Sequence, residues 1–481
     1  MANKTTLVWF RTLLRLADHP ALAEAVTAGD VACLYVLDDA TPATWKRGAA
    51  SRWWLHHSLS ALTADIEARG GRLILRQGQS VDEVLDVATA LAADNIEFTR
   101  GYEPWADDME RQLHDEASAR GIEVKRRGGH LLVEPEKVRT KTGAIYKVYT
   151  PFWRAVSASY DPRGPRPAPK AISAPDKLPA IKSDALDAWG LLPTRPNWAA
   201  DWLDIWTPGE AGAAKSFKAF LKAAINGYDE ERNRPDKPGT SRMSPHLAFG
   251  EIGPQTIWRA ASLHAGGDGQ YDADHETFLK EIVWREFSAH LLANFPHLPD
   301  RPFKEEFDKY PWQPNEDALR AWQKGQTGYP IVDAGMRELW ATGWMHNRVR
   351  MITASFLIKH LMIPWQEGEA WFWDTLVDAD LASNSASWQW VAGSGADASP
   401  YFRIFNPITQ GQKFDPDGAY VRRWVPELAD MPIKYLHAPF DAPTAMLDKA
   451  GVTLGETYPH PLVEHGFARK RALAGYDEMR A

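Results

Sequence analysis

The first 130 residues alternate between short apolar runs and longer segments with helical spacing, and this alternation limits the chain to few folds. Five runs are rich in β-branched and apolar residues, at 7–10, 31–37, 72–76, 95–99 and 122–126. Segments such as SRWWLHHSLSALTADIEARG lie between them. Strands that alternate with helices indicate a doubly wound parallel sheet, covered by helices on both faces. No GxGxxG follows the first run, so the dinucleotide-binding fingerprint is missing. If this domain binds a ligand, we expect it at the carboxyl ends of the strands.

The strand signals stop after about residue 205. Segments 213–228, 275–295 and 335–362 have the spacing and length of helices. Residues 161–180 contain six prolines in DPRGPRPAPKAISAPDKLPA, which is typical of an extended linker. A chain of 481 residues is too long for one typical core. We therefore predict an α/β domain at 1–135, an inter-domain linker at 136–205 and an all-helical domain at 206–481.

The composition restricts where the protein acts. Cys33 is the only cysteine, which excludes an internal disulfide framework and a cysteine zinc cluster, and we predict no metal site. No apolar run reaches the roughly 18 residues that cross a bilayer, and the N-terminus MANKTTLVWF shows no signal-peptide pattern. We expect a cytoplasmic monomer that does not bind membranes.

The net charge of −8 argues against a generally basic nucleic-acid-binding surface. It leaves room for a local patch, since Arg232, Arg234, Lys237 and Arg242 stand close together in the sequence. Arg348 and Arg350 form a smaller group. The alternative for both groups is an ordinary solvated surface.

The stretch KPGTSRMSPHLAFGEI (237–252) has features of a phosphate site. Ser244 followed by Pro245 predicts a helix start, with the serine as N-cap and the proline at the first helical position. Hydroxyl groups and free amides precede this start, a combination that suits a phosphate. The alternative is a capped helix without a ligand.

Two further segments place polar and aromatic side chains on one helical face. Glu281 and Trp284 are three residues apart, and Asn347 and Met351 are four apart, so each pair shares a face. An amide can read a base edge, and methionine is an adaptable contact for a flat ring. The alternative is a surface glutamate beside a core tryptophan. We interpret His346 as a structural histidine.

Trp388 and Trp390 stand two residues apart among small and polar residues. On a helix, residues two apart point about 200° away from each other. One indole is therefore expected to face a pocket and the other the protein interior. For any single tryptophan among the 22, core packing is the alternative.

Together these segments resemble the DNA photolyases and cryptochromes, nearly from end to end, and most closely the bacterial cyclobutane pyrimidine dimer photolyases. The matching stretches are VWFRTLLRLADHPAL, TSRMSPHLAFGEI, EIVWREF, GYPIVDAGMRELWATGWMHNRVRM, DADLASNSASWQWVAGSGADASPYFRIFNP and YPHPLVEHGFARKRALAGY. The resemblance implies FAD bound in the helical domain. It also implies light-driven repair, in which the excited reduced flavin gives one electron to a flipped-out dimer and later recovers it.

The resemblance also implies residue roles. Arg350 and Asp378 match the ion pair beside the flavin ring, and Asn384 matches the residue that faces flavin N5, where plant cryptochromes carry Asp. The full set of implied FAD contacts is Tyr228, Thr240, Ser241, Arg242, Met243, Ser244, Arg350, Asp378, Asp380 and Asn384.

The implied DNA contacts divide into lesion and phosphate contacts. The lesion contacts are Glu281, Trp284, Asn347, Met351 and Trp390, and the phosphate contacts are Arg232, Arg348 and Arg403. Glu281 would stabilise the dimer radical anion by hydrogen bonding. In 6-4 photolyases two histidines occupy the positions of Asn347 and Met351, which favours the cyclobutane lesion here. Binding to damage would bring the protein to the bacterial nucleoid.

An electron-hopping chain and an antenna are implied in the same way. Trp388 would begin the chain, which continues through Trp365 to Trp312 near the surface. Glu103 and Trp105 are the predicted contacts of an antenna, 5,10-methenyltetrahydrofolate; deazaflavin or no antenna are the alternatives.

The sequence departs from the family pattern in two places. Leu13 stands where the family usually has Asp. At the antenna, Trp105 and Ala106 replace an Asn-Glu pair, and Leu298-Pro299 replaces a Cys-Lys pair. With GAASRWWLHHSL (48–59), this looks closer to the branch related to plant cryptochromes.

Three other functions remain open at this point. A cryptochrome-like photoreceptor would share the flavin and the tryptophans, but Asn384, the lesion contacts and the lack of an extension after Arg480 favour repair. The others are a 6-4 photolyase and a light-independent flavin oxidoreductase.

Overall fold

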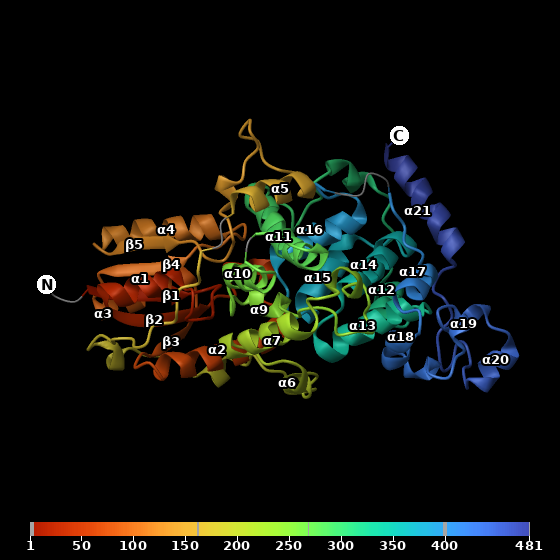
Figure 1. Ribbon diagram of the computed structural model, residues 1–481, viewed down its shortest axis with the longest axis horizontal. Helices are drawn as coiled ribbons and strands as arrows, with labels where there is room; N and C mark the ends of the chain where they lie inside the picture. Colours follow the sequence, from red (N-terminus) through yellow and green to blue (C-terminus); the bar gives the residue numbers. More distant parts are fainter. Residues whose placement is uncertain (1–3, 161–162, 268, 398–401, 481) are drawn as a thin grey trace. The chain divides into compact units, whose positions relative to one another are not determined.

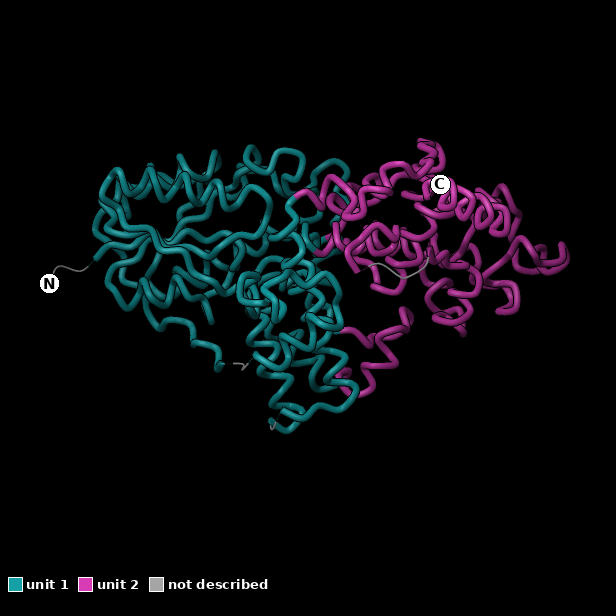
Figure 2. The backbone as a smooth tube through the Cα atoms, turned by 90° about the horizontal axis from the view of Figure 1, so that it is seen from above, with its two compact units in different colours: residues 1–223, 241–296, 377–382 teal, residues 224–240, 297–376, 383–481 magenta. Residues whose placement is uncertain are grey.

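The computed structural model describes residues 4–160, 163–267, 269–397 and 402–480. It divides into two compact units, each built from separate stretches of the chain (Figure 2). Unit 1 comprises residues 1–223, 241–296 and 377–382, and unit 2 comprises 224–240, 297–376 and 383–481. The predicted domain boundaries at 135 and 205 stay predictions.

Unit 1 contains the expected sheet of five parallel strands (Figure 1). The strands are β1 (Lys4–Phe10), β2 (Gly29–Leu37), β3 (Leu73–Gln77), β4 (Asn95–Thr99) and β5 (Glu123–Arg127), in the order β3-β2-β1-β4-β5. Each lies within three residues of its predicted range at either end. The chain leaves β1 toward β2 and later returns to β4 on its other side, so the topological switch point lies between β1 and β4.

Four helices alternate with these strands, as the sequence predicts. They are α1 (Pro20–Ala28), α2 (Ala49–Glu67), α3 (Ser80–Leu91) and α4 (Ala106–Ala119). α3 and α4 pack against the sheet and against each other, and their apolar residues form one core with Leu7 and Trp9 of β1. Successive strand residues point to opposite faces, so Val8 and Phe10, also buried, face the other layer.

The remaining elements are helical. Unit 1 also holds α5 (Tyr149–Ser159), α6 (Trp202–Ile205), α7 (Glu210–Ala223), α9 (Ser244–Ala248), α10 (Pro254–His264) and α11 (Ala273–Asn294). The other helices are α8 (Tyr228–Glu231), α12 (Glu316–Gln323), α13 (Pro330–Thr342), α14 (Asn347–Ser355), α15 (Trp365–Thr375), α16 (Leu381–Ala392), α17 (Pro407–Phe414), α18 (Ala419–Trp424), α19 (Ile433–Leu436), α20 (Thr444–Lys449) and α21 (His465–Arg480). After Arg127 the described residues form only an isolated bridge, so the second half is helical as expected.

The segment 335–362 is helical but not continuous: it contains the end of α13, then α14, and a π-helical turn over Phe356–His360. Gly343 has a φ of 68°, a left-handed conformation that ends α13. His346 then caps α14 by accepting a hydrogen bond from the main-chain nitrogen of Arg348 at 3.2 Å. His346 therefore has a structural role as the cap that determines where α14 begins.

The predicted cap at Ser244 is wrong by one residue. Ser244 is the first residue of α9, Met243 occupies the N-cap position, and no side chain caps the helix. The preceding Arg242 has a φ of 52°, so the chain turns before the helix instead of at the serine.

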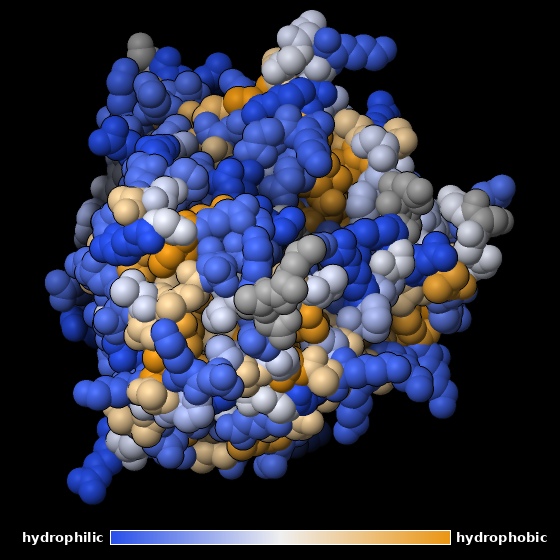
Figure 3. Space-filling model, turned by 90° about the vertical axis from the view of Figure 1, so that its left-hand side faces the viewer, coloured by the Kyte–Doolittle hydropathy of each residue, from blue (hydrophilic) through white to orange (hydrophobic). Residues whose placement is uncertain are grey.

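The surface is mixed in character. The face in Figure 3 is dominated by hydrophilic residues, and its apolar residues lie in separate patches. Among the described residues, no helix combines the length and the apolar character that a bilayer crossing requires.

Candidate active site

Helix α16 gives its two tryptophans different surroundings, as predicted. Trp388 is 2% exposed and packs on Phe372 and Trp322, with ring centroids 5.0 and 6.3 Å away. Its ring lies so close to Gly368 that a Cβ atom there would stand 2.1 Å from Cη2. Trp390 is only half buried. One indole therefore belongs to the interior and the other reaches the surface of unit 2.

Gln389, between the two tryptophans, holds this orientation. Its side-chain nitrogen donates to the carbonyl oxygens of Leu298 and Arg301 at 2.7 and 3.0 Å. Its side-chain oxygen accepts from the main-chain nitrogen of Phe303 at 2.7 Å. Gln389 is not among the residues predicted from the sequence, although a polar side chain between two large rings is a signal in itself.

Two lysines hold the carboxyl end of the same helix. Lys359 donates to the carbonyl oxygen of Ala392 at 2.6 Å, and Lys304 donates to that of Gly393 at 3.1 Å. A helix C-terminus attracts positive charge. Burial lowers the pKa of Lys359 well below its usual value.

The side chain of Asn384 is fastened to α15. Its nitrogen donates to the main-chain carbonyl oxygen of Glu369 at 3.0 Å. The neighbouring Ser385 hydroxyl donates to the Glu369 carboxyl at 2.6 Å. Burial raises the pKa of Glu369 well above its usual value, and the Ser385 hydrogen bond opposes that shift only in part. Burial therefore favours the uncharged form of the acid that lies beside Asn384.

The first turns of α14 carry the second predicted group. Asn347 is exposed, whereas Arg348 and Met351 are half buried. The Arg348 guanidinium donates to the Asn233 side-chain oxygen at 2.6 Å and lies 4.5 Å from the centre of the Phe414 ring. Two parts of unit 2 far apart in sequence thus fix the direction of a predicted phosphate contact.

Arg350, on the same helix, donates through Nε to the carbonyl oxygen of Met345 at 2.7 Å. It belongs to unit 2, while Asp378, which is 8% exposed, and Asp380 belong to unit 1. The ion pair between Arg350 and Asp378 stays a prediction.

The predicted lesion residues of unit 1 lie on α11. Glu281 and Trp284 are both half buried. The Trp284 indole stacks on Tyr149 at the start of α5, with ring centroids 3.6 Å apart and planes inclined by 5°. Tyr149 is not among the residues predicted from the sequence, because no sequence pattern links residues 135 positions apart.

The expected basic cluster is largely neutralised. Arg234 pairs with Asp236 at 2.7 Å and Asp417 at 3.2 Å, and Lys237 lies 3.6 Å from the Glu231 carboxylate. The Arg232 guanidinium lies 5.6 Å from the ring centre of the buried Tyr228. The Arg242 guanidinium lies 5.5 Å from the Trp206 ring.

The main chain just before α9 packs closely against the main chain at the end of α8. A Cβ atom at Gly239 would stand 2.8 Å from the carbonyl oxygen of Glu231, so this position requires glycine. Thr240 and Ser241 follow directly, and the Ser241 hydroxyl accepts from the main-chain nitrogen of Met243 at 3.4 Å.

The other predicted residues of unit 2 are buried to different degrees. Trp365 is 2% exposed at the start of α15. Trp312 is half buried, with its ring 4.5 Å from that of Tyr310. Arg403 is exposed, and its guanidinium lies 4.8 Å from the centre of the Phe405 ring.

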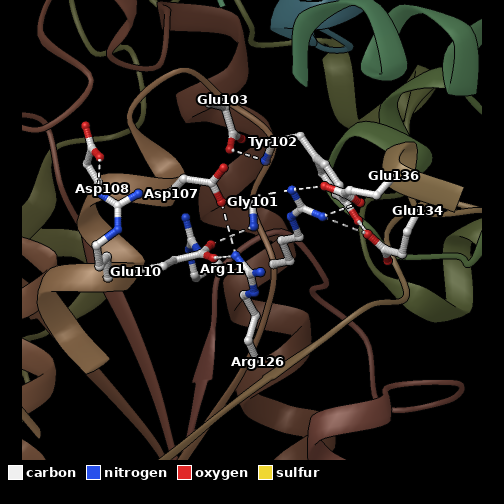
Figure 4. Close-up of polar contacts among 12 residues, drawn as sticks. Arg11, Gly101, Tyr102, Glu103, Asp107, Asp108, Glu110, Arg126, Glu134 and Glu136 are labelled. Atoms are coloured by element: carbon white, nitrogen blue, oxygen red, sulfur yellow. Dashed lines mark hydrogen bonds and ion pairs between the residues drawn. The ribbon is translucent and has the colours of Figure 1, made fainter. Parts of the chain in front are cut away.

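Glu103 and Trp105, the antenna candidates, lie in the loop after β4, beside the switch point. Figure 4 shows Glu103 among the polar residues of this loop. Glu103 accepts from the main-chain nitrogen of Tyr102 at 3.0 Å, and Trp105 is half buried directly before α4. Glu110 pairs with Arg11 at the end of β1 and accepts from Gly101 at 2.8 Å, so it joins the ends of β1 and β4.

Charges around this loop are mutually compensated. Arg126 contacts Asp107 and Glu110, each at 3.1 Å, and Arg100 contacts Glu136 at 2.7 Å. The hydrogen bond from Arg100 lowers the pKa of Glu136. Within the described ranges, no three His, Cys, Asp or Glu side chains are arranged to hold a metal ion.

Comparison with known proteins places this geometry in a family. Residues 6–172 match the family described as DNA photolyase, and residues 278–478 match the FAD binding domain of DNA photolyase. The deoxyribodipyrimidine photo-lyase of Agrobacterium fabrum is 52% identical, over 100% of this chain and 99% of that protein. The chain belongs to the DNA photolyase and cryptochrome family. The membership and the fold class expected from the sequence are thereby confirmed.

Other relatives of this photolyase-family chain lie on both branches. Cryptochrome-1 of Arabidopsis thaliana is 37% identical over 98% of the chain and 70% of its own length. A crystal structure of a bacterial class III photolyase from Agrobacterium tumefaciens superposes with a TM-score of 0.95 at 50% identity, covering 100% of this chain and 98% of that one.

The photolyase FAD-binding match contains Arg350, Asp378, Asp380 and Asn384 and begins after Tyr228 and the 240–244 segment. The residues present fit the cofactor at Asn384, because its donating nitrogen is used by Glu369 and its carbonyl oxygen is turned away from that contact. That oxygen is an acceptor of the kind a protonated flavin nitrogen requires.

Proposed function

We propose that the protein repairs cyclobutane pyrimidine dimers in DNA in a light-driven reaction, as a deoxyribodipyrimidine photo-lyase. The observation that carries the proposal is the arrangement of α16, which presents Asn384, a buried Trp388 and a half-buried Trp390 on one fastened helix. The net reaction breaks the two carbon–carbon bonds that join the pyrimidines, and no electron is consumed.

FAD is the cofactor in this proposal, and when bound and reduced it supplies the electron that light transfers to the dimer. Arg350, Asp378 and Asp380 would hold its ring system, and the Asn384 carbonyl would accept a hydrogen bond from it. Tyr228 and residues Thr240, Ser241, Arg242, Met243 and Ser244 would contact its phosphates. The main chain around Gly239 is packed closely enough to present such groups in a fixed arrangement.

The substrate in this proposal is DNA with the dimer flipped out of the duplex. Trp284 and Trp390 would pack on the pyrimidine rings, and Asn347, Met351 and Glu281 would contact their edges. A hydrogen bond from Glu281 would stabilise negative charge that develops on a pyrimidine carbonyl. Arg232, Arg348 and Arg403 would bind phosphates, and the anchoring of Arg348 by Asn233 supports this role.

Trp388, Trp365 and Trp312 would carry electrons from the surface to an oxidised flavin. Trp388 packs at Gly368, and Gly368 lies three residues after Trp365 on one face of α15, which supports the first step.

A folate antenna, 5,10-methenyltetrahydrofolate, would contact Glu103 and Trp105 at the carboxyl end of β4. Doubly wound sheets bind ligands at this edge. We further propose that the protein acts as a cytoplasmic monomer that meets damaged DNA at the nucleoid.

The test uses oligothymidine that carries cyclobutane dimers, mixed with the reduced protein under blue light. Repair restores thymine absorbance in the ultraviolet, and the same mixture in the dark is the control. A light-dependent rise is the expected result. No rise from a protein whose flavin is bound and photoreducible would contradict repair and favour a cryptochrome-like photoreceptor. Repair of 6-4 photoproducts alone would assign the other lesion.

A further inference from the structure

The stack between Tyr149 and Trp284 joins two helices that are far apart in the sequence. The ring centroids lie 3.6 Å apart and the planes differ by 5°, so the rings overlap face to face. Aromatic pairs elsewhere commonly settle at offset or tilted geometries with wider spacing. Tyr149 is 8% exposed, whereas Trp284 is half buried.

A hydrogen bond fixes the tyrosine to the same helix that carries the tryptophan. The Tyr149 hydroxyl donates to the main-chain carbonyl oxygen of Lys280 at 2.6 Å. Lys280 precedes Trp284 by four residues, which is about one turn of α11. Tyr149 therefore contacts the Trp284 side chain through its ring and the preceding turn of α11 through its hydroxyl group.

The neighbouring Phe287 lies beside the stacked pair of Tyr149 and Trp284. Its ring centroid lies 5.9 Å from that of Tyr149 and 5.9 Å from that of Trp284, at interplanar angles of 74° and 76°. A ring equally distant from two parallel rings lies beside the pair and not above either face. Phe287 thus limits sideways movement of the stack and does not cover the face of Trp284 that is turned away from Tyr149.

We propose that Tyr149 is a positioning residue that holds the Trp284 indole in one orientation, so that its outer face can stack on a flipped-out pyrimidine. The inference rests on the proposed function, because Trp284 is assigned to the lesion there. A preset indole loses little side-chain freedom when the base arrives, and this increases affinity for damaged DNA.

The test compares Tyr149→Leu, which removes the ring, with Tyr149→Phe, which keeps the ring and loses the hydroxyl. Tyr160→Leu is the matched control, because Tyr160 follows the same helix and its ring lies 5.2 Å from that of Trp258, which has no assigned role. Dissociation constants are measured for one oligonucleotide with and without a dimer. Near-ultraviolet circular dichroism reports the stacked pair, and flavin content reports folding.

We expect Tyr149→Leu to weaken binding of the dimer-containing strand about tenfold, which is within the range of a lost base stack. Binding of the undamaged strand and flavin content should not change, and the circular dichroism of the stacked rings should disappear. Tyr149→Phe should retain most of the affinity, and Tyr160→Leu should match the unsubstituted protein.

Three results would overturn the inference. The first is unchanged dimer affinity in Tyr149→Leu, and the second is equal weakening for damaged and undamaged strands, which indicates a merely structural role. The third is a Tyr149→Phe variant as weak as Tyr149→Leu, since the ring would then contribute nothing. If the unsubstituted protein does not distinguish the two strands, the proposed function fails and this inference fails with it.

Discussion

The side-chain nitrogen of Asn384 donates a hydrogen bond to the main-chain carbonyl oxygen of Glu369 across 3.0 Å. This contact decides which way the amide points, because the nitrogen and oxygen of an amide occupy opposite arms. Ser385 strengthens the connection through the buried Glu369 carboxyl. The acceptor oxygen of Asn384 is therefore fixed by α15 before any cofactor binds.

Replacing Asn384 by Asp should disturb this arrangement. A carboxylate cannot donate to the Glu369 carbonyl, and it adds negative charge where a reduced, anionic flavin is proposed to bind. We expect a several-fold lower yield of fully reduced flavin after blue light with a thiol donor, measured by absorbance. Asn315→Asp is the control, because Asn315 caps α12 by accepting from Ala318, which an aspartate does equally well. Equal yields in both variants would contradict the role of Asn384.

The sequence predicts the fold well because its signals are local. Strand runs, helix spacing and the difference between Trp388 and Trp390 follow from periodicities of two and 3.6 residues. The cap at Ser244 was wrong, and the break at Gly343 was not predicted, since turns at Arg242 and Gly343 depend on backbone conformation that composition signals weakly.

The parts of the site that escaped prediction are all long-range contacts. Tyr149 lies 135 residues from the tryptophan on which it stacks, and Gln389 reaches a loop about 90 residues earlier. Glu369 acts through its main chain, which carries no sequence signal. The pairing of Arg234 with Asp417, which lies 183 residues away, is a further long-range contact that the sequence does not indicate.

Gln389→Leu should lower the stability of unit 2. The substitution leaves two carbonyl groups and one N–H group of the 298–303 loop without the hydrogen bonds that Gln389 provides. The bond to Leu298 is buried, and its loss costs about 1–3 kcal/mol, whereas the two part-buried bonds contribute about 0.5–1.5 kcal/mol each. We therefore expect a loss of roughly 2–6 kcal/mol in the free energy of unfolding. Denaturant titration measures it. Gln366→Leu, at an exposed position of α15, serves as control, and equal stability of both variants would contradict the assignment.

Trp388→Phe should abolish photoreduction of oxidised flavin and leave repair by chemically reduced protein intact. Phenylalanine preserves the apolar packing against Phe372 but is far harder to oxidise than an indole. Absorbance of the flavin under blue light follows the first reaction, and thymine absorbance follows the second. Trp424→Phe, a half-buried tryptophan on α18, should behave as the unsubstituted protein. Photoreduction at the normal rate in Trp388→Phe would remove it from the electron path.

Glu281→Ala should lower the repair yield more than DNA binding. The carboxyl group is proposed to act on charge that develops during the reaction, so it contributes little to the ground-state complex. We expect a several-fold fall in repair per absorbed photon at saturating DNA, with a dissociation constant changed less than threefold. The control is Glu276→Ala, because Glu276 lies on the same helix, α11, more than one turn before Glu281. Equal losses of yield and binding would contradict the role.

Glu286→Gln should change how stability depends on pH. Burial raises the pKa of Glu286 to about 7, although Arg285 and the main-chain nitrogens of Leu132 and Val133 oppose the shift. The folded protein thus keeps a proton that an unfolded chain, with a carboxyl pKa near 4.5, releases earlier. Because the folded state binds more protons between these values, the free energy of unfolding falls as the pH rises from about 4.5 to about 7.

The full size of this effect is about 3 kcal/mol, from about 1.4 kcal/mol for each pKa unit. Glutamine does not ionise, so Glu286→Gln does not lose this stability as the pH rises. The free energy of unfolding of the variant, relative to that of the unsubstituted protein, should therefore be higher at pH 8 than at pH 5. Melting temperatures at both pH values measure the change. Glu306→Gln, at an exposed position, should show no such gain. A difference between Glu286→Gln and the unsubstituted protein that stays constant with pH would show that Glu286 is ionised throughout.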